Sequence, residues 1–314
     1  MGTVKTVERL CPNCGGGDFI PHARGRDFEY KTCDNEFKMV RCAACDLVFL
    51  NPTLDPGELD VVYPPEYEPF HFNTNKNWIY RLRSALKAKN AQYLRDLLPD
   101  GARILDVGCG DGEYLTNLER INSSWELEGI DFGETAVKLA RSQGLQVVQG
   151  NYENVDLGEN RYDLIILNQV IEHFSEPQKV VEKIARELKP GGYANIETPC
   201  LDGWDHHLFK NQYWGGYHFP RHLVLFSEAT IRRFMASRGF ETIRVRYMAS
   251  PVFWVFSLHH LWENCVGPGA SFWGTRNFAA LGAATLMDMI QRLVRGKTSN
   301  MQVVARKRNS DGEL

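Results

Sequence analysis

Three glycines and three acidic side chains lie close together in the stretch RILDVGCGDGEYL, residues 103–115. Glycines between a strand and a helix let the backbone approach a ligand closely. The fingerprint of dinucleotide-binding turns accommodates Gly108 and Gly110, but Glu113 stands where its third glycine would fall, and a carboxylate there repels a pyrophosphate. Asp106 adds negative charge at the mouth of the turn, which favours a cationic ligand. The pattern therefore predicts a nucleoside without phosphates and with positive charge.

Four further motifs follow this turn along the chain. They are LEGIDFG (127–133), QGNYENVDL (149–157), YDLIILNQVIEHFSEP (162–177) and LKPGGYANIETP (188–199). Together with LDVGCGDG they resemble, in order and spacing, the class I S-adenosylmethionine-dependent methyltransferases, and the resemblance covers roughly residues 90–248. It implies a Rossmann-like α/β fold with a seven-strand sheet, S-adenosylmethionine as the cofactor and methyl transfer as the reaction.

The resemblance also implies roles for residues at the ends of the expected strands. Asp131 would hold the ribose hydroxyls, a task suited to a carboxylate that accepts two hydrogen bonds, and capping of the next helix is a compatible second role. Asn151 and Tyr152 fall where the adenine is contacted, whereas Asn168 and Gln169 would face the methionine part. The full predicted cofactor set is Asp106, Gly108, Cys109, Gly110, Asp131, Phe132, Asn151, Tyr152, Asn168 and Gln169.

Glu172 and His173, just past the fourth expected strand, are candidates for the proton chemistry. Methyl transfer is an in-line displacement, so the enzyme must align the acceptor and, for a hydroxyl, remove its proton. Similarity to the ubiquinone-biosynthesis O-methyltransferases places this pair beside the cofactor, with His173 as the base. The same residues could instead form a hydrogen-bonded pair that shapes the pocket at a helix start. The sequence leaves both interpretations open.

The segment 201–227 follows the fifth expected strand and is dense in aromatic and imidazole side chains. Ligands of open α/β sheets bind beyond the carboxyl ends of the strands, so this segment is placed to cover the site. We interpret it as a substrate lid. The predicted catalytic residues are Glu172, His173, Tyr217, His218 and His222.

Two cysteine pairs near the N-terminus have the spacing of a metal site. Cys11 and Cys14 are separated by two residues, as are Cys42 and Cys45. Each pair can present two thiolates from one turn to a tetrahedral ion at about 2.3 Å, and four thiolates leave no open position for catalysis. The module resembles a zinc ribbon, and we expect a structural zinc ion. Two redox-active pairs are the alternative.

The motifs divide the chain into a zinc ribbon over residues 1–50, a proline- and aromatic-rich linker over 51–77 and a methyltransferase domain over 78–314. Because proline does not join the interior of a sheet or helix, we expect the linker to be a loop packed on the domain. Residues 78–98 show helical periodicity. Strands are expected near 103–107, 125–130, 145–149, 162–167, 192–197, 241–249 and 301–308.

Residues 250–298 are expected to form a helical insertion before the last strand. Its first half carries one acidic side chain, no lysine or arginine, and three tryptophans. Apolar helices most often pack against protein, which predicts a buried helix pair or a homo-oligomer interface. The same composition would also suit an apolar acceptor site or a shallow, peripheral membrane contact near Arg292 and Arg295. Both alternatives stay open.

The composition of the chain limits the classes of binding partner that we expect. With 36 basic and 39 acidic side chains, and a formal charge of -3, the chain lacks the electrostatic footprint of a nucleic-acid-binding protein. No apolar run is long enough to span a bilayer and no secretory signal is visible, so a cytoplasmic location is expected. We expect O-methylation of a small-molecule, glycan or lipid-linked hydroxyl. Sugar C-methylation is the alternative, and a zinc-ribbon RNA-modification protein is the alternative from another class.

Overall fold

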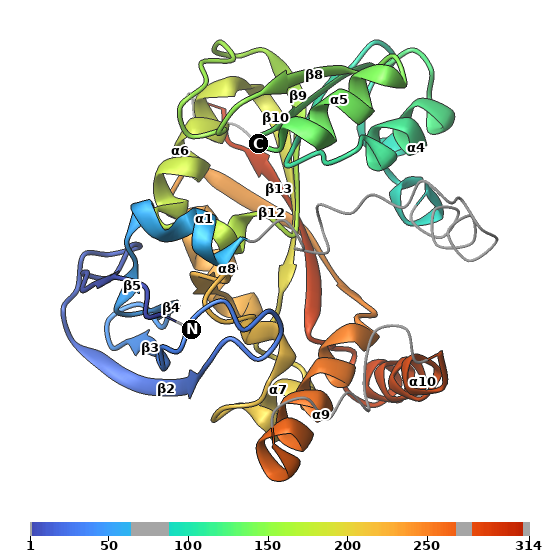
Figure 1. Cartoon of the computed structure of the whole chain (residues 1–314). Coiled ribbons are helices and arrows are strands. Elements are labelled where there is room, and N and C mark those ends of the chain that lie inside the picture. Colours follow the sequence, from blue (N-terminus) through green and yellow to red (C-terminus); the bar gives the residue numbers. More distant parts are fainter. Residues whose placement is uncertain (1, 64–87, 268–277, 310–314) are drawn as a thin grey trace.

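The computed structural model describes residues 2–63, 88–267 and 278–309 and is built around a seven-stranded sheet (Figure 1). The strand order is β12-β13-β10-β9-β6-β7-β8, parallel except that β13 runs antiparallel to both of its neighbours. The strands are β6 (Arg103–Val107), β7 (Glu126–Asp131), β8 (Gln146–Gln149), β9 (Tyr162–Asn168), β10 (Leu188–Pro199), β12 (Phe240–Met248) and β13 (Asn300–Lys307). All seven expected strands are therefore present, and the predicted α/β fold is confirmed.

Helices cover both faces of this sheet. In Figure 1, α4 (Glu113–Ile121) and α5 (Glu134–Ser142) lie on one side, and α6 (Pro177–Glu187) and α8 (Glu228–Ala236) lie on the other. The central strands are apolar on both faces for this reason, and residues 164–167 of β9 are completely buried. Proline begins α6, where its missing N–H costs nothing, and the Ser227 side chain caps α8 by accepting from the Thr230 amide.

The helix expected over residues 78–98 falls partly outside the described residues, which resume at 88. Residues 88–91 are helical, a turn follows at 92–93, and α3 (Leu94–Leu97) continues to the start of the sheet. Leu94 and Leu98 pack with Leu118 of α4 beneath Ile104. The described part of this helix is thus interrupted, not continuous as its periodicity predicted.

The N-terminal residues form a second, antiparallel sheet. It consists of β2 (Phe19–Gly25), β3 (Phe37–Cys42), β4 (Val48–Leu50) and, from far along the chain, β11 (Val224–Leu225). A small two-stranded sheet pairs β1 (Thr6–Val7) with β5 (Thr53–Leu54). The ribbon module therefore takes one strand from the segment that was expected to be a lid.

The linker prediction is wrong at its beginning. After β5 come a short 3-10 turn, η1 (Pro56–Glu58), and one helical turn, α1 (Leu59–Val62), while residues 64–77 lie outside the described residues. Neither β5 nor α1 contains proline, so their backbone amides can take part in regular hydrogen bonding. The prediction of a loop rested on the proline content of the whole segment, and it therefore missed these two short elements.

The cover segment, residues 201–227, is a packed part of the molecule and not a loose lid. It contains α7 (Trp204–Phe209), η4 (Gly215–Tyr217) and β11, and the side chains of Trp214, Tyr217 and Arg221 are fully buried. The Trp214 indole donates to Asp205, and the Arg221 guanidinium pairs with Asp27 of the ribbon module. The segment therefore ties the ribbon to the large sheet.

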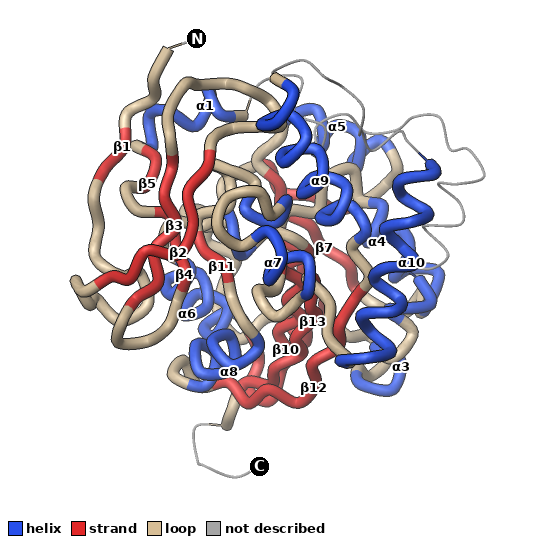
Figure 2. The backbone as a smooth tube through the Cα atoms, turned by 90° about the horizontal axis from the view of Figure 1, so that it is seen from below, coloured by secondary structure: helices blue, strands red, loops and turns tan. Residues whose placement is uncertain are grey.

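The insertion between β12 and β13 is helical, as expected. Figure 2 shows α9 (Pro251–Val266) and α10 (Phe278–Arg295) side by side at one edge of the molecule. Asp288 of α10 accepts hydrogen bonds from the Ser250 amide and the Trp254 indole, which holds the two helices together. Among the described residues, no helix is both long and apolar enough to cross a membrane.

Candidate cofactor and acceptor site

The glycine turn between β6 and α4 has the backbone shape that only glycine adopts easily. Gly108 has φ +70°, and a Cβ atom there would meet Val170 Cγ2 at 2.7 Å. Gly112 has φ +80°, and its Cβ would meet Leu145 Cδ1 at 2.1 Å. Side chains at either position would therefore be strained and would clash. The turn therefore needs glycine at both positions, and it lies at the carboxyl end of β6, where ligands of this kind of sheet bind.

Asp131, at the end of β7, closes this turn from the neighbouring strand. Its Oδ2 accepts from the Gly110 amide at 2.9 Å and its Oδ1 accepts from the Gly133 amide at 2.8 Å. Burial raises the pKa of the Asp131 carboxyl, although both amide hydrogen bonds favour the charged form. Each carboxylate oxygen keeps a second lone pair, so a ligand hydroxyl could still be held.

Asp106 and Cys109 lie beside Asp131 in the same turn. Asp106 is almost completely buried at 2% exposed, and Cys109 packs under α4 and α5. Burial, and then the charges of Asp106 and Asp131, raise the pKa of the Cys109 thiol, which is therefore neutral and inert. Two carboxylates thus face one small turn, and the turn favours a cation.

Phe132 and Asn151 form the exposed rim of this side. Phe132 is 60% exposed immediately after Asp131, and Asn151 follows β8 with its Oδ1 accepting from the Glu153 amide. An exposed aromatic ring at the end of a strand is suited to stacking on a planar base. Their contact with a cofactor stays a prediction.

Tyr152 is a correction to the predicted cofactor set. Its ring is buried in the main core, and its hydroxyl donates to Glu187 Oε2 of α6 at 2.5 Å. The side chain therefore points into the face that α6 covers, not to the rim where an adenine would be contacted. Tyr152 lies in the turn that follows Asn151, and its buried ring and the exposed Asn151 face different surroundings.

Asn168 ends β9 and Gln169 follows it, with its side chain turned towards β10 and β13. Gln169 has φ +57°, and its Nε2 donates to Asn300 Oδ1 at 2.9 Å. Asn300 in turn donates to Glu197 Oε1 at 2.8 Å. These hydrogen bonds form a polar wall along the ends of three neighbouring strands. Glu197 and Asn300 are additions to the predicted site.

Glu172, His173 and His222 come together next to this wall, although His222 lies far along the chain. The His173 and His222 rings are 4.9 Å apart, and one donor atom from each of the three side chains lies within 4.8 Å of the others. The Leu223 amide donates to the Glu172 carbonyl at 2.7 Å, so backbone pairing fixes the two segments together. Three of the predicted catalytic residues are therefore neighbours in space.

The hydrogen bonds of the two imidazoles determine which nitrogen carries a proton. His222 Nδ1 lies 2.8 Å from the Gly216 carbonyl, and a carbonyl can only accept, so Nδ1 donates and Nε2 keeps its lone pair. His173 Nδ1 lies 3.1 Å from the Arg221 carbonyl and 3.0 Å from the Tyr63 hydroxyl. A proton on Nδ1 satisfies this carbonyl as well, which leaves Nε2 of His173 as a proton acceptor.

Burial sets the charge of this cluster. It lowers the pKa of His173 to about 3, with the charge of His218 as the next cause, and lowers the pKa of His222 well below its usual value. Burial also raises the pKa of Glu172 to about 8, despite a hydrogen bond from the Thr198 hydroxyl at 3.0 Å. At neutral pH the cluster therefore holds two uncharged imidazoles and a carboxyl that is mostly protonated.

Tyr217 and His218 lie outside this cluster. The Tyr217 hydroxyl donates to the Lys210 carbonyl, and its ring packs against Trp214 and His206. His218 Nδ1 pairs with Glu29 Oε2 of the ribbon at 2.5 Å, although its ring is 5.0 Å from that of His222. The structure therefore gives both residues contacts that hold the cover segment in place.

The four predicted metal ligands meet at one point of the ribbon. Cys11 Sγ lies 3.5 Å from Cys45 Sγ, and Cys14 Sγ lies 3.5 Å from Cys42 Sγ, with all four sulfurs within 4.8 Å. Each pair sits on a turn whose backbone closes onto its first cysteine, through the Gly15 and Asp46 amides. Four sulfurs at this spacing fit a tetrahedral zinc ion. Glu172, His173 and His222 are the other group of donors that could hold a metal among the described residues.

Tyr63 and Thr198 were missed by the sequence reasoning, although both contact the catalytic cluster. Tyr63 is the last described residue before the gap that begins at 64, and it belongs to the segment that was assigned as a linker. Thr198 belongs to the fifth strand motif, whose last residues must approach the site because they end a central strand. That position alone could have identified Thr198.

Comparison with known proteins agrees with this architecture. A family model described as "Methyltransferase domain" matches residues 78–245, which is more than half of the chain. One chain of a complex between the Haloferax volcanii Trm112 methyltransferase activator and a putative methyltransferase has a TM-score of 0.51 and 17% identity, covering 74% of this chain and 95% of that one. At this identity the likeness concerns the fold.

Two curated relatives are more similar in sequence. A tRNA (carboxymethyluridine(34)-5-O)-methyltransferase of Arabidopsis thaliana is 33% identical over 226 residues, which is 65% of this chain. A ubiquinone biosynthesis O-methyltransferase of Bordetella avium (strain 197N) is 30% identical over 142 residues, which is 42% of this chain. Each match spans 53% of the relative's own length. With its glycine turn, strand order and family match, this chain belongs to the methyltransferase-domain family.

Proposed function

We propose that the protein methylates a hydroxyl group of a small-molecule, glycan or lipid-linked acceptor, with His173 and His222 as the proton acceptors. The pair of imidazoles whose Nδ1 atoms face backbone carbonyls carries this proposal, because it leaves two Nε2 lone pairs directed away from the backbone. A hydroxyl is a poor nucleophile until its proton is removed, and a neutral imidazole in hydrogen-bond reach can accept that proton.

The glycine turn and its two carboxylates are the proposed cofactor side. Asp131 would hold the ribose hydroxyls, Phe132 and Asn151 would flank the adenine, and Asp106 and Asn168 would face the charged methionine end. S-adenosylmethionine, when bound, supplies the methyl group. Gly108 and Gly110 carry no side chain and both have positive φ, so the main chain of the turn could approach the ligand, and two carboxylates would balance its positive charge.

On the acceptor side, His173 or His222 would take the hydroxyl proton on Nε2 as the oxygen gains its methyl group. A histidine with a strongly lowered pKa is a weak base, so its acquired proton must be released again quickly. Glu172 is the adjacent group that titrates nearest to neutrality, and burial is what places its pKa there. We assign the ionised fraction of Glu172 to accepting the proton from the imidazolium and then releasing it to solvent, while Tyr63 and Thr198 orient the cluster.

We also propose that Cys11, Cys14, Cys42 and Cys45 hold a structural zinc ion. The four thiolates would occupy all four coordination positions of the ion, which leaves no open position for substrate. Cys42 ends β3, which pairs with β4, and β4 in turn pairs with β11 of the cover segment. The ion would therefore stabilise the support of the acceptor side and take no part in the chemistry.

Methylation of tRNA is the second candidate function. Both of these curated relatives are named as O-methyltransferases, one for a tRNA and the other for ubiquinone biosynthesis. The expectation that nucleic acid is not a partner rested on net charge alone, and these relatives do not support it. Both candidates agree on a hydroxyl acceptor, which favours O-methylation over the sugar C-methylation alternative.

The test is transfer of an isotope-labelled methyl group from S-adenosylmethionine by the purified protein. A cell extract would be separated into small metabolites, lipids and tRNA, and each fraction would be incubated and examined by mass spectrometry. Label bound to oxygen in the metabolite or lipid fraction is the expected result. Label confined to tRNA would replace the first candidate by the second, and label on carbon or nitrogen would overturn both.

A further inference from the structure

The outer helix of the insertion, α10, has its polarity reversed relative to an ordinary surface helix. Its inward side carries Asp288 and Gln291, which are buried and hydrogen-bonded to the Trp254 indole and the Trp204 amide. Its outward side is apolar. The exposed large residues on it are Leu286, Met287, Met289, Ile290, Leu293 and Val294. A surface helix normally shows the opposite arrangement.

The exposure of these side chains is large. Leu293 is 84% exposed, Val294 66% and Leu286 57%, so little of the described protein covers them. Positions 286, 289, 290 and 293 follow one another at three- and four-residue steps, so they form one continuous stripe. A contiguous exposed apolar surface of this kind marks an interaction site.

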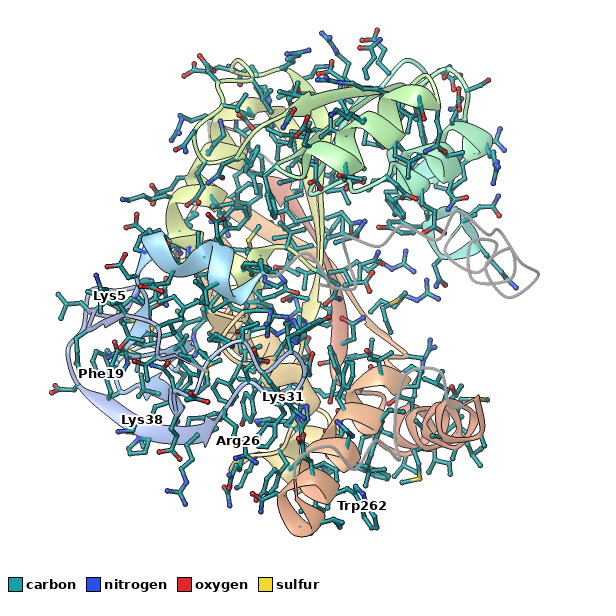
Figure 3. All side chains as sticks on the ribbon, viewed as in Figure 1. Lys5, Phe19, Arg26, Lys31, Lys38 and Trp262 are labelled. Atoms are coloured by element: carbon teal, nitrogen blue, oxygen red, sulfur yellow. The ribbon has the colours of Figure 1, made fainter. Side chains whose placement is uncertain are left out.

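The neighbouring helix α9 extends the stripe. Ser257, His260 and Glu263 point inward and are buried, whereas Leu261, Trp262 and Val266 are exposed. Figure 3 shows Trp262 at the outer end of α9, away from the ribbon residues Lys5 and Phe19. Tryptophan is the side chain best suited to the boundary between water and lipid.

The exposed charged side chains on and beside these two helices are cationic. The acidic residues of the described parts of α9 and α10, Glu263 and Asp288, are both buried. Arg292 and Arg295 are exposed at the end of α10, and Arg244 is exposed on β12. Burial, and then the charges of Arg292 and Arg244, lower the pKa of Arg246, which places these guanidinium groups near one another.

We propose that the α9–α10 surface docks on a lipid bilayer that contains anionic headgroups. The apolar stripe would enter the boundary between headgroups and acyl chains, and the arginines would meet the phosphates. A second copy of this chain suits the surface less well. A two-fold contact would bring the same cationic edge of both copies together, with no exposed carboxylate on either helix to offset it.

The docking surface is independent of which acceptor is methylated. The inward side of α9, and not the docking surface itself, contacts the cover segment: Ser257 accepts from the Gly215 amide at 2.9 Å and α7 packs beside α9. Docking would therefore bring the acceptor side of the protein to the membrane surface, and a lipid-linked acceptor would gain from this arrangement.

The experiment is sedimentation of the full chain with vesicles of phosphatidylcholine alone, or of phosphatidylcholine with phosphatidylglycerol, at low and physiological salt. Ile290→Glu is compared with Ile20→Glu, because the two isoleucines are 39% and 43% exposed and the second lies on the ribbon. Arg292→Gln is compared with Lys38→Gln, which removes one exposed cation from the ribbon.

Binding to the anionic vesicles is expected, with a loss of at least about tenfold for Ile290→Glu and about fivefold for Arg292→Gln, and none for either ribbon variant. Equal binding to both vesicle types would overturn the assignment of anionic headgroups. Absence of binding would overturn the proposal, as would an equal loss for Ile20→Glu and Ile290→Glu. A dimer in size-exclusion chromatography that Ile290→Glu dissociates, without vesicle binding, would assign the surface to a second copy.

Discussion

The two sides of the site are built in different ways. The cofactor side consists of one turn and the residues that end the two adjacent strands, and Asp131 reaches the Gly110 amide over a short distance in sequence. The proposed acceptor side combines Tyr63, His173 and His222, which come from three distant segments. A local motif is therefore sufficient for the first, whereas the second depends on the packing of the ribbon and the cover segment.

This difference predicts that damage to the ribbon should affect the acceptor side more than the cofactor side. Purified protein should contain one zinc ion per chain, and replacing both Cys11 and Cys42 by serine should abolish its retention. Zinc binding by four thiolates is worth about 10–16 kcal/mol in small modules, so the ribbon should lose its fold. Elemental analysis measures the metal. Full metal retention in the double variant would contradict the assigned ligands.

Loss of the buried ion pair between Asp27 and Arg221 is expected to have the next largest effect, on the free energy of unfolding. The two terminal nitrogens of the Arg221 guanidinium, Nη1 and Nη2, each lie 3.0 Å from an oxygen of the Asp27 carboxylate. Both side chains are completely buried. Asp27→Ala leaves an uncompensated charge and should lower the free energy of unfolding by about 3–5 kcal/mol. Denaturant titration measures this. Asp27→Leu combined with Arg221→Met should recover much of the loss, and an equally unstable double variant would show that the charge is not the cause.

His173→Ala and His222→Ala should each reduce turnover by about a hundredfold or more, because a general base is lost. Affinity for S-adenosylmethionine should stay nearly unchanged, since neither histidine belongs to the glycine turn. His207→Ala is the matched control, because His207 is an exposed histidine of the same cover segment. Kinetics with the acceptor found by label transfer provide the measurement. Normal turnover in both variants would exclude imidazole base catalysis here.

Asp131→Asn should weaken S-adenosylmethionine binding by about tenfold or more, because a charged hydrogen bond is worth about 1.5–3 kcal/mol. Isothermal titration calorimetry measures the affinity. Glu119→Gln, on the exposed side of α4, makes the same change in charge and should bind normally. Unchanged affinity in Asp131→Asn would mean that the second strand is wrongly aligned with the family.

The smallest expected effect concerns pH. Burial, followed by the charges of Arg41 and Lys210, lowers the pKa of His22 to about 4. The folded pKa is below the unfolded value of about 6.5, so stability is complete above pH 6.5 and falls as the pH drops towards 4. His22→Phe should reduce this acid slope by up to one proton. Melting temperatures between these pH values measure it, and an unchanged slope would exclude His22 as a contributor.

The sequence predicted the seven strands because each is an apolar run between recognisable turns, as for β9. It also predicted the cysteine cluster, since the spacing of Cys11 and Cys14 brings their sulfurs to one turn. The prediction from sequence failed for short elements whose partners lie far away in the sequence. β11 is two residues long and pairs with β4, and nothing in its two apolar residues indicates that partner. Tyr152 was misassigned because its neighbour Asn151, but not Tyr152 itself, faces the rim.

The cover segment shows the same limit. Its density of histidine and aromatic side chains suggested a mobile lid over a substrate. Asp27 and Glu29, which pair with Arg221 and His218, lie on the ribbon almost two hundred residues earlier, so these contacts could not be inferred from the segment itself. Composition indicated that the segment mattered, but only the fold showed which of its side chains are structural.

The most direct test of the division between the two sides is a single-turnover measurement of methyl transfer on three proteins: wild type, Asp131→Asn and His173→Ala. The rate constant would be followed as a function of S-adenosylmethionine concentration with saturating acceptor. We predict that Asp131→Asn shifts the half-saturating concentration by about tenfold at a nearly normal limiting rate. His173→Ala should lower the limiting rate by about a hundredfold at a normal half-saturating concentration. A fall in the limiting rate for both variants, with no change in half-saturation for either, would contradict the account.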